Sequence, residues 1–204
     1  MSIDLHLEGH VCVITINRPE RMNALDAAHY DDLSAAWCRV RDDPQIRVAV
    51  VTGAGEKAFC AGADLKSFVS SEPELQEIML TQKSQLLNRG LDVWKPVVAA
   101  VNGYCLGGGM TLLLVSDIRI ASRHAKFGLS EVKRGIFPGH GGTQRIAQQL
   151  PYAIAMEILL IGDQFGTDLA ERWGLINQVT DDENLMETAF TYAEKLAANA
   201  PLAV

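Results

Sequence analysis

The chain has 204 residues, which is enough for one large domain or for one domain with an appendage. Apolar residues make up 48% of the sequence and charged residues 21%, a balance that permits a sizeable buried core. The formal net charge of −7 argues against a general surface for nucleic acid or anionic membranes, although it leaves room for one anionic small molecule. No apolar run reaches the roughly 18 residues that span a bilayer, and residues 1–11 lack the basic start of a signal peptide.

The four cysteines show neither the CxxC spacing nor the Cys/His spacing of a metal site. They are Cys12, Cys38, Cys60 and Cys105. Such isolated thiols are typical of small buried side chains in a reducing compartment. We therefore expect a cytoplasmic protein that holds no metal ion and makes no contact with a membrane.

Short β-rich runs alternate with helical segments along the chain. Residues 2–8 and 11–16 fit a hairpin, Asp26 is placed to cap the next helix, and 58–65 forms a loop of small residues. This alternation indicates an α/β domain with parallel pairing. Further strands are predicted at 48–51, 96–101, 117–121 and 176–179, and helices at 27–40, 74–93, 141–149, 151–161, 167–173 and 182–199.

The rest of the chain is organised around the stretch 101–131, which contains three consecutive glycines at 107–109. Glycine allows a close backbone approach that a Cβ would block. If Met110–Val115 is a helix, its first turn presents unpaired N–H groups to a negative oxygen above the glycines. Considered alone, tight helix packing explains such a triplet at least as well.

Four stretches in the right order, covering nearly the whole chain, resemble the crotonase superfamily, that is, the enoyl-CoA hydratase/isomerase family. The stretch 158–179 fits the same pattern. The four are NRPERMNALD at 17–26, VVTGAGEKAFCAGADLKSF at 50–68, PVVAAVNGYCLGGGMTL at 96–112 and FGLSEVKRGIFPGHGGTQRI at 127–146.

The resemblance implies a crotonase-like spiral of ββα units with two roughly perpendicular sheets, followed by a helical C-terminal region. On this basis we assign residues 1–180 to the spiral core and 181–204 to the start of the helical region, and we expect the chain to be truncated there. Family members bind acyl-CoA thioesters and assemble as trimers or pairs of trimers. We expect the same here, with coenzyme A as part of the substrate and no separate cofactor.

The resemblance also assigns site residues. Two backbone N–H groups that hold the thioester oxygen map to Ala63 and Gly108. Arg18, Arg21, Lys57 and Lys66 lie in the loops expected near the CoA phosphates, although each is also an ordinary surface charge. The full set of expected substrate-binding residues is Arg21, Ala24, Ala61, Ala63, Asp64, Leu65, Lys66 and Gly108.

The expected acid/base groups reduce to one carboxylate. Hydratases of the family carry two glutamates, and the two matching positions here are Thr111 and Glu131. A dienoyl-CoA isomerase would have an aspartate where this chain has Gly139. A threonine hydroxyl can orient water but is not a general acid or base near neutral pH. We therefore predict Glu131, Ala63, Gly108 and Thr111 as catalytic residues, in an isomerase or a specialised hydratase or lyase.

The roles of Glu131 and His140 and the class of the protein stay open at this point. Glu131 follows Ser130 before a short turn, so it could be an ordinary helix-start carboxylate, and His140 could either exchange protons or simply line the pocket. The alternative to an enzyme is a crotonase-fold protein that binds CoA esters or RNA without catalysis. RNA binding requires a basic face, whereas residues 27–43 carry four aspartates against two arginines.

Overall fold

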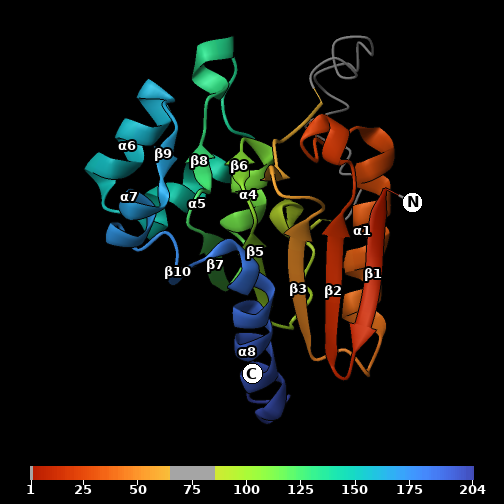
Figure 1. The fold of residues 1–204 in the computed structure, drawn as a ribbon. Coiled ribbons are helices and arrows are strands. Elements are labelled where there is room, and N and C mark those ends of the chain that lie inside the picture. Colours follow the sequence, from red (N-terminus) through yellow and green to blue (C-terminus); the bar gives the residue numbers. More distant parts are fainter. Residues whose placement is uncertain (1, 65–85) are drawn as a thin grey trace.

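The computed structural model describes residues 2–64 and 86–204, and its strands form two sheets (Figure 1). The larger sheet has the order β1-β2-β3-β5-β7-β10, and the smaller one has the order β4-β6-β8-β9. The strands of the larger sheet are β1 (Ile3–Glu8), β2 (Val11–Ile16), β3 (Val48–Gly53), β5 (Val97–Val101), β7 (Ile118–Ser122) and β10 (Gln178–Thr180). Those of the smaller sheet are β4 (Ala58–Cys60), β6 (Tyr104–Leu106), β8 (Lys126–Gly128) and β9 (Phe165–Gly166).

Helices fill the connections between these strands. The α-helices are α1 (Ala27–Asp42), α4 (Gly108–Leu113), α5 (Gly142–Gln149), α6 (Tyr152–Ile161), α7 (Thr167–Arg172) and α8 (Leu185–Ala198). The described residues also form the short 3-10 turns η1 (Pro19–Arg21), η2 (Leu87–Arg89), η3 (Glu131–Arg134) and η4 (Asp182–Asn184). No helix in the described part of the chain is long and apolar enough to cross a membrane.

The chain passes back and forth between the two sheets. Strands β3, β5 and β7 belong to the larger sheet, and each is followed in sequence by a strand of the smaller one, β4, β6 and β8. The predicted hairpin is confirmed, since β1 and β2 are antiparallel with Glu8 opposite Val11. The predicted parallel pairing is confirmed from β2 through β10, whereas β8 and β9 pair antiparallel.

Alternation along the strands of the larger sheet sends side chains to two separate cores. On one face, Val48 and Val50 of β3 pack in a cluster with α8, whose Leu185, Ala189 and Ala193 are buried at a spacing of four residues. On the other face, residues such as Ala49 and Val51 join the cluster that contains Leu33, Trp37 and Val40 of α1. The sheet is thus covered on both faces, which suits its parallel strands.

Three sequence predictions differ from the structure. Residues 74–85 of the helix predicted at 74–93 lie outside the described residues, and the prediction is wrong for 86–93. There the chain makes only the single turn η2, which ends at Gly90 with φ +87°. The predicted loop 58–65 begins with β4, and the helix predicted from Met110 begins at Gly108. The division of the chain at residues 180 and 181 stays a prediction.

Candidate active site

The first and second motif stretches lie side by side. Ala61 N donates to Met22 O at 3.0 Å, Leu25 N donates to Gly62 O at 2.8 Å, and Asp64 N donates to Leu25 O at 2.8 Å. In a parallel bridge of this kind, the residue between the two bonded neighbours turns its own N–H away from the partner. The N–H of Ala63 therefore points away from Leu25.

Asn23 holds the bend of the first stretch. It is completely buried and adopts φ +55°, a conformation that asparagine tolerates better than most residues. Its side-chain amide donates to Ala54 O at 3.0 Å and Ala58 O at 2.6 Å, and its carbonyl accepts from Arg18 N at 2.9 Å. The buried amide therefore ties the bend to the end of β3 and the start of β4.

Arg18 lies within the loops rather than extending towards solvent. Its Nη1 is 3.1 Å from a carboxylate oxygen of Asp64 and 3.3 Å from one of Asp26, and it donates to Ala24 O at 3.1 Å. Asp26 also caps α1 by accepting from His29 N at 3.1 Å, which confirms the predicted cap. Arg18 and Asp64 thus neutralise each other inside the protein, so Arg18 has a structural partner besides any phosphate.

The backbone at Gly62 and the backbone at Gly108 approach each other closely. A Cβ built on Gly62, where φ is +90°, would lie 2.8 Å from Gly108 N. A Cβ built on Gly108 would lie 3.2 Å from Gly62 Cα and 3.6 Å from Ala63 N. Neither Ala63 N nor Gly108 N donates to a carbonyl of the described residues. Two unpaired N–H groups therefore border one small space that only glycine leaves open.

The side chain of Glu131 approaches the turn at Gly107 from η3. It is the first residue of η3, and a Cβ built on Gly107 would lie 3.4 Å from its Oε1. Its Oε2 is buried and has no hydrogen-bond partner among the described residues. Loss of hydration raises the pKa of Glu131. A hydrogen bond from its own backbone N–H and the charge of the nearby Arg134 only partly oppose this effect. Glu131 therefore begins a helical turn and also has a carboxylate that points into the protein.

Thr111, which the sequence resemblance matched to the position of a second glutamate, is 2% exposed. Its hydroxyl donates to Gly108 O at 2.9 Å and accepts from Asn88 Nδ2 at 3.0 Å. One lone pair is left to accept a bond from water, but the hydroxyl proton is already committed. Sequence reasoning missed Asn88 because it placed this residue inside a long helix.

His140 lies beyond Glu131 in a left-handed turn, with φ +53°. Loss of hydration and the positive charge of Arg89 lower the pKa of His140 to about 4. The imidazole is therefore neutral near neutral pH, and an imidazolium cannot be the standing proton donor. Lining the site remains compatible with this neutral state.

The remaining predicted substrate-binding residues lie along the same loops. Arg21 is exposed in η1, and the backbone of Ala24 and Ala61 takes part in the pairing described above. Leu65 and Lys66 lie outside the described residues. The structure thus brings Ala61, Ala63, Asp64, Gly108, Thr111 and Glu131 into one region, although they come from three separate parts of the sequence.

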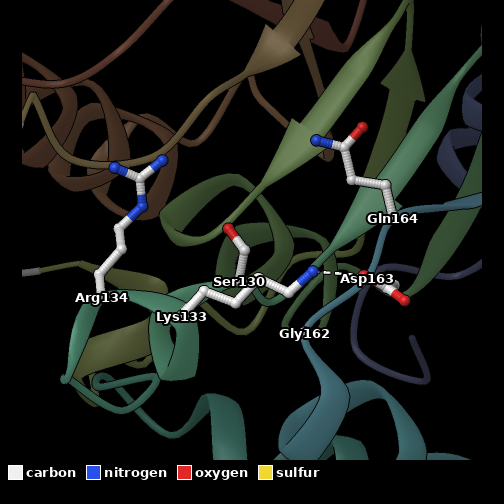
Figure 2. Close-up of a pocket in the computed structure, with 6 residues that line it drawn as sticks. All are labelled: Ser130, Lys133, Arg134, Gly162, Asp163 and Gln164. Carbon is white, nitrogen blue, oxygen red and sulfur yellow. Dashed lines mark hydrogen bonds and ion pairs between the residues drawn. The ribbon is translucent and has the colours of Figure 1, made fainter.

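A concavity of about 600 Å³ lies beside this region and is lined by Ser130, Lys133, Arg134, Gly162, Asp163 and Gln164 (Figure 2). Figure 2 shows Lys133 reaching to Asp163, with which it forms an ion pair, while Arg134 points elsewhere. The carboxylate of Glu131 is not part of the lining and is close to Gly107 instead. We therefore place the candidate chemistry at Gly107 and Gly108 and not in this concavity.

Comparison with solved structures shows that the chain has the crotonase fold of acyl-CoA enzymes. A carnitinyl-CoA hydratase from Mycobacterium avium superposes with a TM-score of 0.89 at 41% identity, over 99% of this chain and 77% of that one. An enoyl-CoA hydratase from Bacillus anthracis superposes with a TM-score of 0.91 at 35% identity, over 100% and 80%. The model of the enoyl-CoA hydratase/isomerase family matches residues 6–204, and the chain belongs to that family.

Similar curated sequences carry the names of hydratases and dehydratases. The chain is 45% identical to (E)-benzylidenesuccinyl-CoA hydratase of Thauera aromatica over 206 residues, which is 100% of this chain and 79% of that protein. It is 42% identical to carnitinyl-CoA dehydratase of Proteus mirabilis, over 100% of this chain and 78% of that protein. The protein is thus an enzyme of the enoyl-CoA hydratase type, and the non-catalytic alternative is not favoured.

Proposed function

We propose that this enzyme adds water to, or removes it from, the acyl chain of a CoA thioester through an enolate. The observation that supports the proposal most strongly is the arrangement at Gly107 and Gly108. There the N–H groups of Ala63 and Gly108 and the carboxylate oxygen Oε2 of Glu131 lack partners among the described residues. Polar groups buried without partners are costly, so a site that keeps several of them is organised for a ligand.

The chemistry follows from what an enolate requires. When a nucleophile adds at the β-carbon of an unsaturated thioester, negative charge moves to the thioester oxygen. Two fixed N–H donors stabilise that oxygen without reorganising, and losing one such donor typically costs about 10²–10³ in rate. In this proposal Ala63 N–H and Gly108 N–H are those donors.

Glu131 is the proposed acid/base group. As a carboxylate it takes a proton from the attacking water, and as a carboxylic acid it returns a proton to the α-carbon. Its raised pKa helps because it narrows the gap between the proton affinities of the carboxylate and of the reacting groups. Thr111 contributes at most a hydrogen-bond acceptor to the water, since its own proton binds Gly108 O.

The rest of the proposal concerns the substrate and the assembly. The backbone around Arg21, Ala24 and residues 61–64 borders the CoA. The protein assembles as a trimer or a pair of trimers in the cytoplasm. The acyl groups named for the two curated relatives both carry substituents. We therefore propose a substituted acyl group rather than a short unbranched one. Light scattering of the purified protein tests the assembly.

A substrate panel tests the reaction. The purified enzyme is mixed with 2-enoyl-CoA esters that carry no substituent, a β-substituent or a carboxylate, and loss of the enoyl absorbance is followed. The proposal predicts saturable hydration of at least one substituted ester and little hydration of 2-butenoyl-CoA. An enzyme that neither adds water to any of these esters nor removes it from their hydrated forms contradicts the proposal.

Isomerisation is the second candidate, and Thr111 is the observation that favours it. Moving a double bond between the 3- and 2-positions needs one carboxylate, whereas hydration works best with two. The variant Thr111→Glu separates the candidates, because Asn88 is already placed to donate to a new carboxylate. A hydratase limited by its missing carboxylate should gain rate on 2-butenoyl-CoA. An isomerase should instead convert a 3-enoyl-CoA rapidly without the substitution.

A further inference from the structure

Tyr30 on α1 points its hydroxyl at the candidate site. A Cβ built on Gly108 would lie 3.5 Å from Tyr30 Oη, and the same point is 3.6 Å from Ala63 N. The residue is only 8% exposed, and its hydroxyl makes no hydrogen bond with the described residues. The hydroxyl therefore borders the same space as the N–H groups of Ala63 and Gly108.

The environment of Tyr30 makes it a hydrogen-bond donor rather than a base. Burial raises the pKa of Tyr30 to about 12, so the phenol keeps its proton throughout the neutral range. The Arg89 guanidinium carbon lies 5.1 Å from the centroid of the ring, within the range of a cation–π contact. A cation over the ring withdraws electron density from the phenol and strengthens its O–H as a donor.

We infer that the hydroxyl of Tyr30 is a third hydrogen-bond donor to the thioester oxygen, beside the N–H groups of Ala63 and Gly108. This inference rests on the proposed function, because it assigns the space beside Gly108 to that oxygen. A third donor stabilises the enolate further and offsets the single carboxylate. It also makes Tyr30 a catalytic residue, because the hydroxyl touches the atom on which negative charge develops.

The variant Tyr30→Phe removes the hydroxyl and keeps the ring under Arg89. Tyr152→Phe is the matched control, because Tyr152 is 72% exposed on α6. With an ester that the wild type turns over, Tyr30→Phe should lower kcat/KM by about a hundredfold to a thousandfold, the range for loss of an oxyanion donor. Tyr152→Phe should leave kcat/KM unchanged. Equal kcat/KM for wild type and a folded Tyr30→Phe protein overturns the inference.

A spectroscopic test separates a hydrogen bond to the thioester from a purely structural role. The absorbance of 3-phenylpropenoyl-CoA, a conjugated thioester, moves to longer wavelength when its carbonyl oxygen receives hydrogen bonds. It is measured bound to Glu131→Gln protein, so that it is not consumed, with and without Tyr30→Phe. The inference predicts a smaller shift when the hydroxyl is missing. An undiminished shift overturns it, even if turnover has fallen.

The same measurement keeps this inference apart from the proposed function. If the wild type turns over no CoA ester, the proposed reaction fails, yet the shift of the bound thioester still reports whether Tyr30 contacts its oxygen. If the wild type is active and the shift is insensitive to Tyr30→Phe, the proposed function stands and the inference about Tyr30 fails.

Discussion

The α8 face of the larger sheet and the site around Gly107 and Gly108 use their residues in opposite ways. On the α8 face, apolar side chains at a spacing of four residues meet the valines of β2 and β3 in a hydrophobic cluster. At the site, Glu131 Oε2 is buried without a partner among the described residues. The first region lowers the free energy of the folded state, and the second raises it in order to receive a ligand. Stability and activity should therefore respond to different substitutions.

The largest effect should come from Glu131→Gln. Removing a positioned acid/base group lowers turnover by about 10²–10⁴, while the shape of the side chain and therefore the binding of the CoA ester are kept. Steady-state kinetics and titration with a saturated acyl-CoA measure the two quantities. Glu157→Gln on the exposed side of α6 is the control. Retention of more than about a tenth of the wild-type kcat would remove Glu131 from the mechanism.

Leu185→Ala should lower the stability of the protein and leave its turnover unchanged. Leu185 is 3% exposed beneath the larger sheet, and emptying such a site costs about 2–5 kcal/mol of the free energy of unfolding. Urea unfolding measures this loss, and kcat per folded molecule should not change. Leu160→Ala, at a residue that is 69% exposed, should cost far less. The comparison fails if Leu185→Ala lowers kcat while the protein remains folded.

A smaller loss should follow from Gly108→Ala. The added methyl group would lie 3.2 Å from Gly62 Cα, which is tight but tolerable, and it would fill the space proposed for the thioester oxygen. We expect kcat/KM to fall by at least about tenfold, with a small change in melting temperature. Gly139→Ala is matched to it, because a Cβ there meets nothing within 4 Å. Equal kcat/KM for the two variants would place the oxygen elsewhere.

The sequence was sufficient to predict the parts of the fold that repeat a simple period. The β-branched run of β3 and the Asp26 cap of α1 are local features, and both are found in the structure. Periodicity did not predict the second sheet, because β4, β6 and β8 have three residues each. Runs this short carry no recognisable alternation, and only the family resemblance implied a second sheet.

The residues of the site, too, could be predicted from the sequence only in part. The resemblance assigned Ala63, Gly108 and Glu131 to one site, and the structure places all three around one glycine turn. Asn88 and Tyr30 were not predicted. Asn88 was assigned to a helix that does not exist at that position, and Tyr30 lies within the predicted helix 27–40 but was not singled out. Burial shows that an aromatic ring belongs to the core, but the direction of its hydroxyl depends on long-range packing.

The most direct test of the site's unpartnered carboxylate oxygen is the melting temperature of Glu131→Gln relative to wild type, measured at about pH 4 and about pH 8. Because the pKa of Glu131 is raised in the folded protein, the folded state binds this proton more tightly than the unfolded chain does. The stability that Glu131 contributes is thus present at low pH and is lost as pH rises through the raised pKa. We predict that Glu131→Gln melts above wild type at the higher pH and that the two converge at the lower pH. A variant that melts below wild type at the higher pH would show that protein partners satisfy the carboxylate, and would contradict a site that is held open for a ligand.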